Sequence, residues 1–309
     1  MRAAIIKTPT PLSSIFSPKV LDGGKPRDNP DMVGARGGGF SFFPGVETEV
    51  ELFDEGSGLK LELNGKAVSF PPTEKAVEVV RKAYGLNGLV VVKHRIHVPI
   101  ATGFGTSAAS ALSVILALTH LAGKPMTLRQ AVKLTHYVEL ECRTGLNSEA
   151  GFGKTGLVLV LREGSPDYSM TDEIPLPSGT KLVSVVAGRV RTPEAIASTE
   201  RLQQLEKIGD MFVDRILQSP TPANFLTQAR AFAEKAGLVS REVHEVFKEL
   251  ENLPTIGFAQ NMVGHATHAL VYKEDVEKVV SALSKKFPQH TIVVGETGAS
   301  INLNPLKNS

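Results

Sequence analysis

The sequence predicts an α+β fold built in two parts, and three observations support this prediction. Residues 47–53 and 59–63 alternate apolar and polar side chains at period two, which is typical of half-buried antiparallel strands. Residues 198–250 contain successive helical patterns and mark a more helical second half. The chain then returns to strands, because residues 267–272 and 291–294 flank a helical stretch, which is compatible with a split βαβ layer.

The first half of the chain begins with an irregular segment and continues with regular elements. Proline and glycine are frequent from Ser13 to Gly39, so we expect a long irregular segment there, of the kind that is usually functional or mobile in a compact protein. The helix expected at 107–122 is apolar enough to lie at the centre of the fold. Apolar spacing predicts helices at 74–84, 107–122 and 128–141 and strands at 89–92, 96–98 and 155–161.

The second half is richer in helices. A continuous apolar run at 181–186 predicts a strand that is buried on both faces. Apolar residues at helical spacing predict four helices, at 198–218, 223–236, 240–250 and 275–286.

Composition narrows the class of protein. The formal net charge of the 309 residues is only +2, so no strong field for nucleic acid is expected. Cys142 is the only cysteine, which excludes an internal disulfide and a cysteine-rich metal cluster. The apolar run at the N-terminus is too short for a signal peptide, and no stretch approaches membrane-spanning length. We therefore expect a cytoplasmic enzyme with no nucleic-acid or membrane partner.

The most informative motif is a glycine-rich turn that leads into the apolar helix. Residues 99–109 read P-I-A-T-G-F-G-T-S-A-A. Gly103 and Gly105 have no Cβ, so the backbone can approach a ligand closely, and the free N–H groups and dipole of the following helix favour an anion. The hydroxyls of Thr106 and Ser107 can cap the helix or reach a phosphate or its magnesium. The residues predicted to form this phosphate loop are Pro99, Gly103, Gly105, Thr106, Ser107, Ala108 and Ala109.

The loop belongs to neither of the two common nucleotide-binding motifs. It contains no Walker lysine, and Ala108 stands where the dinucleotide motif needs its third glycine. The pattern P-x-x-x-G-x-G-[ST]-S-A-A instead resembles the central phosphate-binding motif of the GHMP kinases, the family that contains galactokinase, homoserine kinase and mevalonate kinase.

Within this family the sequence is most similar to the archaeal pantoate kinases. The resemblance extends roughly from residue 16 to residue 301, because further segments match in order. These are V-G-A-R-G-G-G-F at 33–40, H-Y-V-E-L-E at 136–141, T-G-L at 144–146, G-R-V-R-T at 188–192 and A-R-A-F-A-E-K-A-G-L at 229–238.

The resemblance implies both a fold and an activity. The implied fold has an N-terminal lobe of mixed sheet and helices at residues 1–180 and a C-terminal, ferredoxin-like split βαβ lobe at residues 181–309. The implied activity is transfer of phosphate from ATP, with Mg²⁺, to a small hydroxy acid. Pantoate would then be converted to 4-phosphopantoate in archaeal coenzyme A biosynthesis. A homodimer is compatible with this interpretation.

The resemblance also implies roles outside the loop. In the family, a glutamate at the place of Glu139 binds magnesium beside the loop serine, which here is Ser107. A late glycine, Gly264, resembles a third glycine motif that packs near the phosphate loop.

Four residues are predicted to bind the substrate. The guanidinium of Arg36 lies in a glycine-rich segment and has the planar fork that a carboxylate fits. His136 shares a helix face with Glu139 at spacing i, i+3. Arg189 and Thr192 follow a buried strand, at a place where α/β sites commonly open.

The sequence departs from the family where a catalytic base is expected. In pantoate kinases T-G-L is followed by Gly-Asp, and the aspartate activates the attacking hydroxyl, whereas Asn147 and Ser148 occupy these places here. We expect Glu149 to point away from the substrate. Ser148 would then orient the hydroxyl and Lys154 would stabilise charge. The predicted catalytic residues are Ser107, Glu139, Ser148 and Lys154.

Three hypotheses follow from this departure. The chain is a divergent pantoate kinase, or it is a GHMP enzyme of altered substrate such as a mevalonate-type kinase or decarboxylase, or it binds a nucleotide or metabolite without catalysis. Because the transition state of phosphoryl transfer is loose, a kinase can survive the loss of a base. Arg36 and the cluster at 188–192 suit a small hydroxy acid, and the ordered family segments favour pantoate over bulkier sugars, so the sequence favours the first hypothesis.

Overall fold

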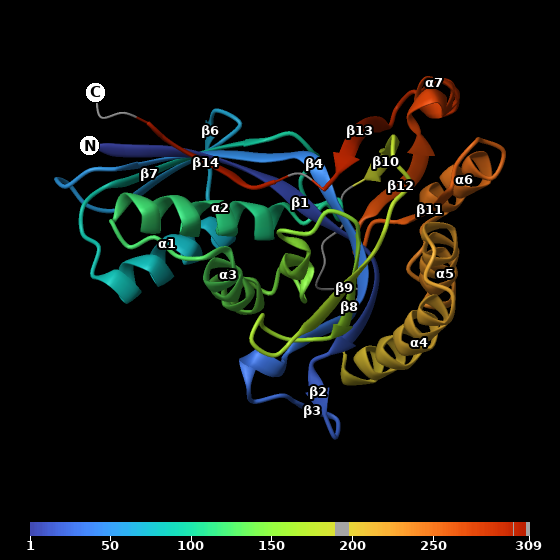
Figure 1. Cartoon of the computed structure of the whole chain (residues 1–309), viewed down its shortest axis with the longest axis horizontal. Coiled ribbons are helices and arrows are strands. Elements are labelled where there is room, and N and C mark those ends of the chain that lie inside the picture. The colour runs from blue at the N-terminus through green and yellow to red at the C-terminus, as the bar shows by residue number, and fades with distance from the viewer. Residues whose placement is uncertain (189–197, 299, 307–309) are drawn as a thin grey trace.

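The computed structural model describes residues 1–188, 198–298 and 300–306, and Figure 1 shows its arrangement. It confirms the α+β fold: helices lie against a 12-stranded sheet that runs through most of the described chain. The predicted substrate residues Arg189 and Thr192 lie outside the described residues.

The described elements have the following bounds. The strands are β1 Arg2–Lys19, β2 Leu21–Asp22, β3 Lys25–Pro26, β4 Gly34–Leu52, β5 Leu59–Leu63, β6 Lys66–Ala67, β7 Val90–Ile96, β8 Leu157–Arg162, β9 Met170–Ile174, β10 Thr180–Gly188, β11 Gly257–Gln260, β12 His265–Tyr272, β13 Thr291–Thr297 and β14 Asn302–Leu306. The helices are α1 Pro71–Tyr84, α2 Thr106–Leu121, α3 Leu128–Cys142, α4 Thr199–Gln218, α5 Pro222–Lys235, α6 Arg241–Leu250 and α7 Val276–Lys286, with 3₁₀ turns η1 Pro30–Met32, η2 Ser148–Gly151 and η4 Lys273–Asp275.

Two long strands replace most of the irregular segment that was predicted between Ser13 and Gly39. β1 and β4 pair antiparallel from Arg2 opposite Leu52 to Lys19 opposite Gly34. The glycines of β4 permit this pairing to be close, since a Cβ on Gly39 would lie 1.9 Å from the carbonyl oxygen of Leu12. The prediction was therefore wrong for all but residues 20–33, which we call the strap and which contain β2, β3 and η1.

The N-terminal helices cover one face of this sheet. α2 packs against β1 and β4 on one side and against α1 and α3 on the other, so it has the central position predicted for the apolar helix that follows the glycine turn. Its side chains are buried on nearly every side. The strands predicted at 89–92 and 96–98 form one strand, β7, whose residues alternate between buried and partly exposed.

The C-terminal part confirms the ferredoxin-like layer. Its strands lie in the order β11-β12-β10-β13, with antiparallel pairing throughout, and α6 and α7 share its hydrophobic core. β13 also pairs with β4, and β14 pairs with β1, so the sheet continues between the two parts. The division at residues 180 and 181 stays a prediction. No helix in the described part of the chain has the length and apolarity needed to cross a bilayer.

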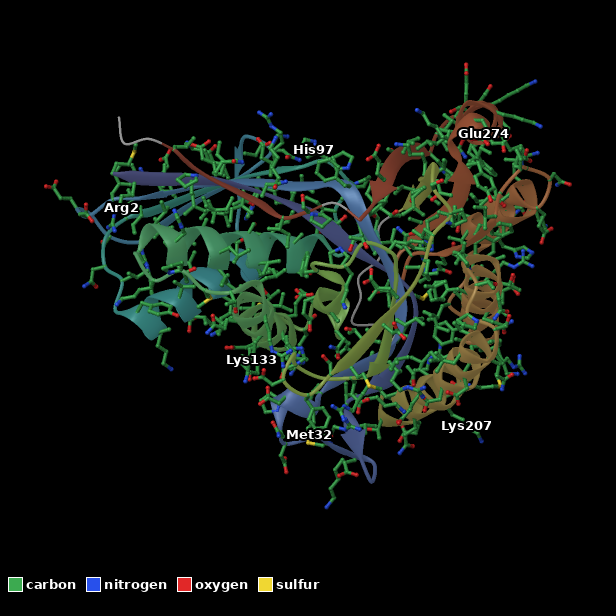
Figure 2. The ribbon with its side chains drawn as sticks, viewed as in Figure 1. Arg2, Met32, His97, Lys133, Lys207 and Glu274 are labelled. Atoms are coloured by element: carbon green, nitrogen blue, oxygen red, sulfur yellow. The ribbon has the colours of Figure 1, made fainter. Side chains whose placement is uncertain are left out.

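The strap lies against the outer side of α3. Figure 2 shows Lys133 of α3 close to Met32 of the strap, and Lys133 Nζ is 3.8 Å from Asp31 Oδ1. The phenol of Tyr137 donates to Asp31 at 2.7 Å. These contacts hold the strap beside the end of α3, where the predicted site residues gather.

Candidate functional site

A cleft of about 820 Å³ lies between the phosphate loop, the C-terminal end of α3 and the strap. Ser107 and Ser148 both line it, so the structure brings the loop serine and the altered turn to one cavity. Apolar side chains form much of the wall, and the charged residues among its described lining are Arg27, Asp28 and Arg143. Such a cleft, apolar with a few convergent polar groups, is typical of a small-molecule site.

The phosphate loop has the backbone form that an anion site needs. Gly105 is the N-cap of α2 with φ of 69° and provides no side-chain cap. The first N–H groups of α2 are therefore available to a ligand at the positive end of the helix dipole. Thr102 donates its hydroxyl to Pro99 O at 2.8 Å and so closes the turn, while Ala108 and Ala109 are buried beneath it.

Neighbouring segments pack tightly on this loop. A Cβ on Gly103 would lie 2.7 Å from Asn261 Cβ, and a Cβ on Gly264 would lie 2.3 Å from Thr102 O. The late glycine predicted to approach the loop therefore does so, and the contact fixes the loop from the C-terminal part of the chain.

Glu139 lies at the centre of the predicted catalytic group. Its carboxylate is buried and accepts hydrogen bonds from Thr144 Oγ1 at 2.6 Å and from Ser148 Oγ at 3.4 Å. Burial raises the pKa of Glu139 to about 7; the hydroxyl hydrogen bonds of Thr144, Ser107 and Ser148 oppose this, and the charge of Glu149 adds to it. Ser107, Glu139 and Ser148 are thus together in the structure.

This donor set fits magnesium. In the described residues no cluster of three or more His, Cys, Asp or Glu side chains could hold a metal by itself. Magnesium in kinase sites is commonly held by one or two carboxylates together with substrate phosphates. Glu139 and the hydroxyl of Ser107 are oxygen donors beside the phosphate loop, so they are the residues that would hold it.

We expect Glu139 to make stability depend on pH. Its folded pKa of about 7 exceeds the ordinary value of 4.5, so its contribution to stability is complete below pH 4.5 and is lost as the pH rises through 7. The loss amounts to about 3 kcal/mol. Melting curves from pH 4.5 to 8 should therefore show the wild type losing stability relative to Glu139→Gln, whereas parallel curves would contradict the raised pKa.

His136 is held by groups of the protein. Its ring is buried, with Nδ1 2.6 Å from Glu149 Oε1 and Nε2 3.0 Å from Pro30 O. Burial lowers the pKa of His136, but the hydrogen bond and charge of Glu149 outweigh it and raise the pKa overall. Both nitrogens then donate to the protein, and the predicted contact of His136 with substrate stays a prediction. His136 ties the turn at Glu149 to the strap at Pro30.

The turn after α3 separates two neighbouring side chains. Asn147 is buried, with φ of 65°, and its Oδ1 accepts from the N–H groups of Ala35 and Gly164. Ser148 lines the cleft, whereas Glu149 points to His136 behind it. This is the arrangement that the sequence analysis predicted for Ser148 and Glu149.

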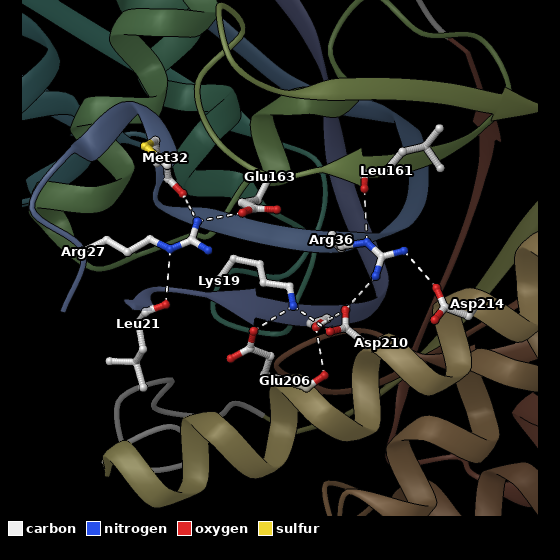
Figure 3. Close-up of polar contacts among 11 residues, drawn as sticks. Lys19, Leu21, Arg27, Met32, Arg36, Leu161, Glu163, Glu206, Asp210 and Asp214 are labelled. Atoms are coloured by element: carbon white, nitrogen blue, oxygen red, sulfur yellow. Dashed lines mark hydrogen bonds and ion pairs between the residues drawn. The ribbon is translucent and has the colours of Figure 1, made fainter. Parts of the chain in front are cut away.

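The side chain of Arg36 is also held by hydrogen bonds and ion pairs within the protein. Its Nε donates to Leu161 O at 3.1 Å, and its two other nitrogens pair with Asp210 at 2.8 Å and Asp214 at 3.0 Å (Figure 3). Lys19 joins the same network through Asp210 at 2.6 Å. Every nitrogen of the guanidinium therefore has a protein partner. Arg36 is not among the described lining residues of the large cleft, but it lines a smaller pocket that shares Ser148 and Leu146 with that cleft, and its role in substrate binding stays a prediction.

Lys154 does not reach the cleft either, since it is not among the described lining residues. Two cations that the sequence analysis did not select do line it, Arg27 and Arg143. Arg143 caps α3 in a left-handed conformation with φ of 55°, directly before Thr144. A signal was present in the sequence, because Arg143 immediately precedes the T-G-L segment.

Comparison with known proteins agrees with this geometry. Residues 73–153, which include the phosphate loop and Glu139, match the GHMP kinases N terminal domain. The chain is 28% identical to the pantoate kinase of Thermococcus kodakarensis, covering 83% of this chain and 86% of that protein. It is 25% identical to the pantoate kinase of Methanocaldococcus jannaschii, covering 81% and 88%.

Solved structures show the same fold. One described as a phosphotransferase related to the CoA biosynthesis pathway has a TM-score of 0.85 at 24% identity and covers 100% of both chains. The mevalonate kinase of Methanococcus jannaschii has a TM-score of 0.68 at 14% identity and covers 96% of this chain and 98% of that one.

Proposed function

We propose that the chain is an ATP-dependent small-molecule kinase of the GHMP type that phosphorylates a small hydroxy acid, and specifically that it converts pantoate to 4-phosphopantoate for coenzyme A synthesis. The observation that carries the proposal is that Ser107 and Ser148 line one cleft and both hydroxyls lie within reach of the buried Glu139, in a chain similar to pantoate kinases over more than four fifths of its length. The proposal places the enzyme in the cytoplasm, where ATP is available.

The residues in and beside the cleft have different roles in the proposed phosphoryl transfer. The N–H groups of the phosphate loop bind the ATP phosphates, and Ser107 and Glu139 would hold magnesium, which would neutralise phosphate charge there. Ser148 hydrogen-bonds the attacking hydroxyl and aligns it with the terminal phosphate. Arg143 supplies the positive charge that was first assigned to Lys154, because it lines the cleft and adjoins Thr144, the hydrogen-bond partner of Glu139.

The absence of an aspartate at position 148 is compatible with turnover. The transition state of phosphoryl transfer is loose, so positioning and charge neutralisation supply most of the rate, and the hydroxyl proton need not leave before the new bond forms. General-base assistance contributes about 100- to 10,000-fold where it is present, so we expect a slow kinase.

Replacing Ser148 by aspartate should preserve the rate or raise it by up to about 100-fold, because a carboxylate would then face the substrate hydroxyl and could accept its proton. The measurement is kcat with pantoate at saturating magnesium, which also screens the new carboxylate from Glu139. Ser148→Ala is the matched control and should be slower than the wild type. An inactive Ser148→Asp beside a fully active Ser148→Ala would show that this turn does not face the hydroxyl.

A second candidate function is nucleotide binding without transfer. It is favoured by one observation: the only acidic side chain among the described lining residues is Asp28, on the strap rather than on the turn. Measurement of ADP release with pantoate, mevalonate and other hydroxy acids separates the candidates. Release with pantoate supports the main proposal, and release only with mevalonate or its phosphates indicates an altered substrate. If the wild type and Ser148→Asp both bind ATP but neither releases ADP with any of these acids, the protein binds nucleotide without transferring phosphate.

A further inference from the structure

We propose that Arg27 binds the carboxylate of the hydroxy acid through Nη2, the one guanidinium nitrogen that has no hydrogen-bond partner in the described part of the chain. The proposal rests on the proposed function and replaces Arg36, whose nitrogens are all engaged, as the carboxylate-binding residue. Arg27 lies on the strap and lines the large cleft.

The rest of the Arg27 side chain is held in place. Nε donates to Leu21 O at 3.3 Å, and Nη1 donates to Met32 O at 2.5 Å and to Glu163 Oε1 at 2.6 Å (Figure 3). Nη2 has no hydrogen-bond partner among residues 1–188, 198–298 and 300–306. The side chain is only 18% exposed, so a carboxylate there would meet a preoriented and partly desolvated donor.

A chain of contacts places this guanidinium on the same side of the cleft as Ser148. Glu163, the partner of Arg27, directly precedes Gly164. The Asn147 side chain donates to Gly164 O at 2.6 Å and accepts from Gly164 N at 2.8 Å. Since Asn147 directly precedes Ser148, the guanidinium is held to the turn that presents the proposed hydroxyl-orienting group. Arg27 and Ser148 both line the cleft, so a hydroxy acid bound there has both groups on its walls.

The other described cation of the cleft lies on the nucleotide side. Arg143 adjoins Thr144, which hydrogen-bonds Glu139, and Glu139 in turn contacts the loop residue Ser107. Two cations therefore correspond to two anionic ligands: Arg143 to the phosphates and Arg27 to the carboxylate.

Steady-state kinetics of Arg27→Gln test the proposal. The KM for the hydroxy acid should rise by about 10- to 100-fold, since a charge-assisted hydrogen bond is lost. The KM for ATP and the kcat at saturation should stay within about threefold, the ordinary scatter of such effects. The primary amide of the same acid keeps the hydroxyls but carries no charge. Its affinity for the enzyme, measured as substrate or competitor, should therefore be nearly the same in Arg27→Gln as in the wild type.

Two further variants separate binding from support of the strap. Glu163→Gln removes the ion pair but keeps an oxygen that accepts from Arg27; it should leave the KM for the acid near that of the wild type. Arg27→Lys keeps the positive charge without the planar guanidinium and should raise the KM for the acid by several-fold. A melting curve verifies that this variant folds. If Arg27→Gln unfolds the strap, Arg27→Lys is the variant that tests the proposal.

The proposal is overturned if Arg27→Gln weakens binding of the acid and binding of the amide equally. It is also overturned if Glu163→Gln raises the KM for the acid as much as Arg27→Gln does, or if the folded Arg27 variants bind the acid like the wild type. A wild type that phosphorylates no hydroxy acid overturns the proposed function itself, and this outcome is recognised before any variant is made.

Discussion

Replacement of Glu139 by glutamine is expected to lower kcat by about 100- to 1,000-fold while ATP still binds. The carboxyl group is buried beside the loop serine and within reach of three hydroxyls, so it is the acidic oxygen donor to which magnesium would be bound. Glutamine has the same shape and still accepts hydrogen bonds, for example from Thr144, but it carries no charge. The loss should therefore fall on turnover rather than on folding.

The measurement is single-turnover transfer across a range of magnesium concentrations, with nucleotide affinity followed by calorimetry. Glu141→Gln is the matched control, because Glu141 lies on the same helix but pairs with Lys75 at the surface, and its rate should equal that of the wild type. An unchanged rate for Glu139→Gln would remove Glu139 from the metal site.

Replacement of Gly105 by valine is expected to abolish measurable ATP binding, a loss of more than about 100-fold. Gly105 has φ of 69°, a region that valine avoids, and a Cβ there would lie 2.3 Å from Pro11 O. The backbone of the loop must move to relieve this contact, and the N–H groups at the start of α2 would move with it.

Gly123→Val is the matched control for this variant. Gly123 follows the other end of α2, has the same φ of 69° and has no atom within 4 Å of its added Cβ. Gly123→Val therefore introduces the same backbone strain as Gly105→Val, but without a steric contact and away from the proposed phosphate site. Thermal melting reports the strain in both proteins, and calorimetry reports ATP affinity. A Gly105→Val protein that binds ATP like the Gly123→Val protein would show that the loop does not hold the phosphates.

Elements with strong local signals could be predicted from the sequence. The helices α1, α2 and α3 and strand β5 follow apolar periodicity, and the observed ends lie within a few residues of the predicted ones. β1 and the start of β4 were missed because proline and glycine mark turns in most sequences. Here the glycines of β4 are required by the close approach of β1, and such a contact between distant segments has no local pattern.

The candidate site also contains features that have a local signal in the sequence and features that have none. The glycine turn before α2 could be predicted from its local motif, and the resemblance to the family implied that Glu139 lies beside Ser107, as it does. The protein partners of Arg36 and His136 could not be predicted, since a guanidinium or imidazole looks the same in sequence whether it faces a ligand or a protein carboxylate. Asp214 lies far along the chain from Arg36, and only the folded structure shows that the two residues pair.

The pairing of β14 with β1 has a consequence for how the molecule assembles. Leu306 lies opposite Ala3 and Asn302 lies opposite Lys7, so strands about 300 residues apart in sequence share a ladder. The entropy of closing so long a loop grows slowly with length and leaves the final stability almost untouched, but such nonlocal pairing is among the slowest steps in folding. Until β14 arrives, residues 3–7 of β1 offer an open edge to any other strand, because only their β4 side is covered. During folding, the short last strand therefore protects the first strand from aggregation.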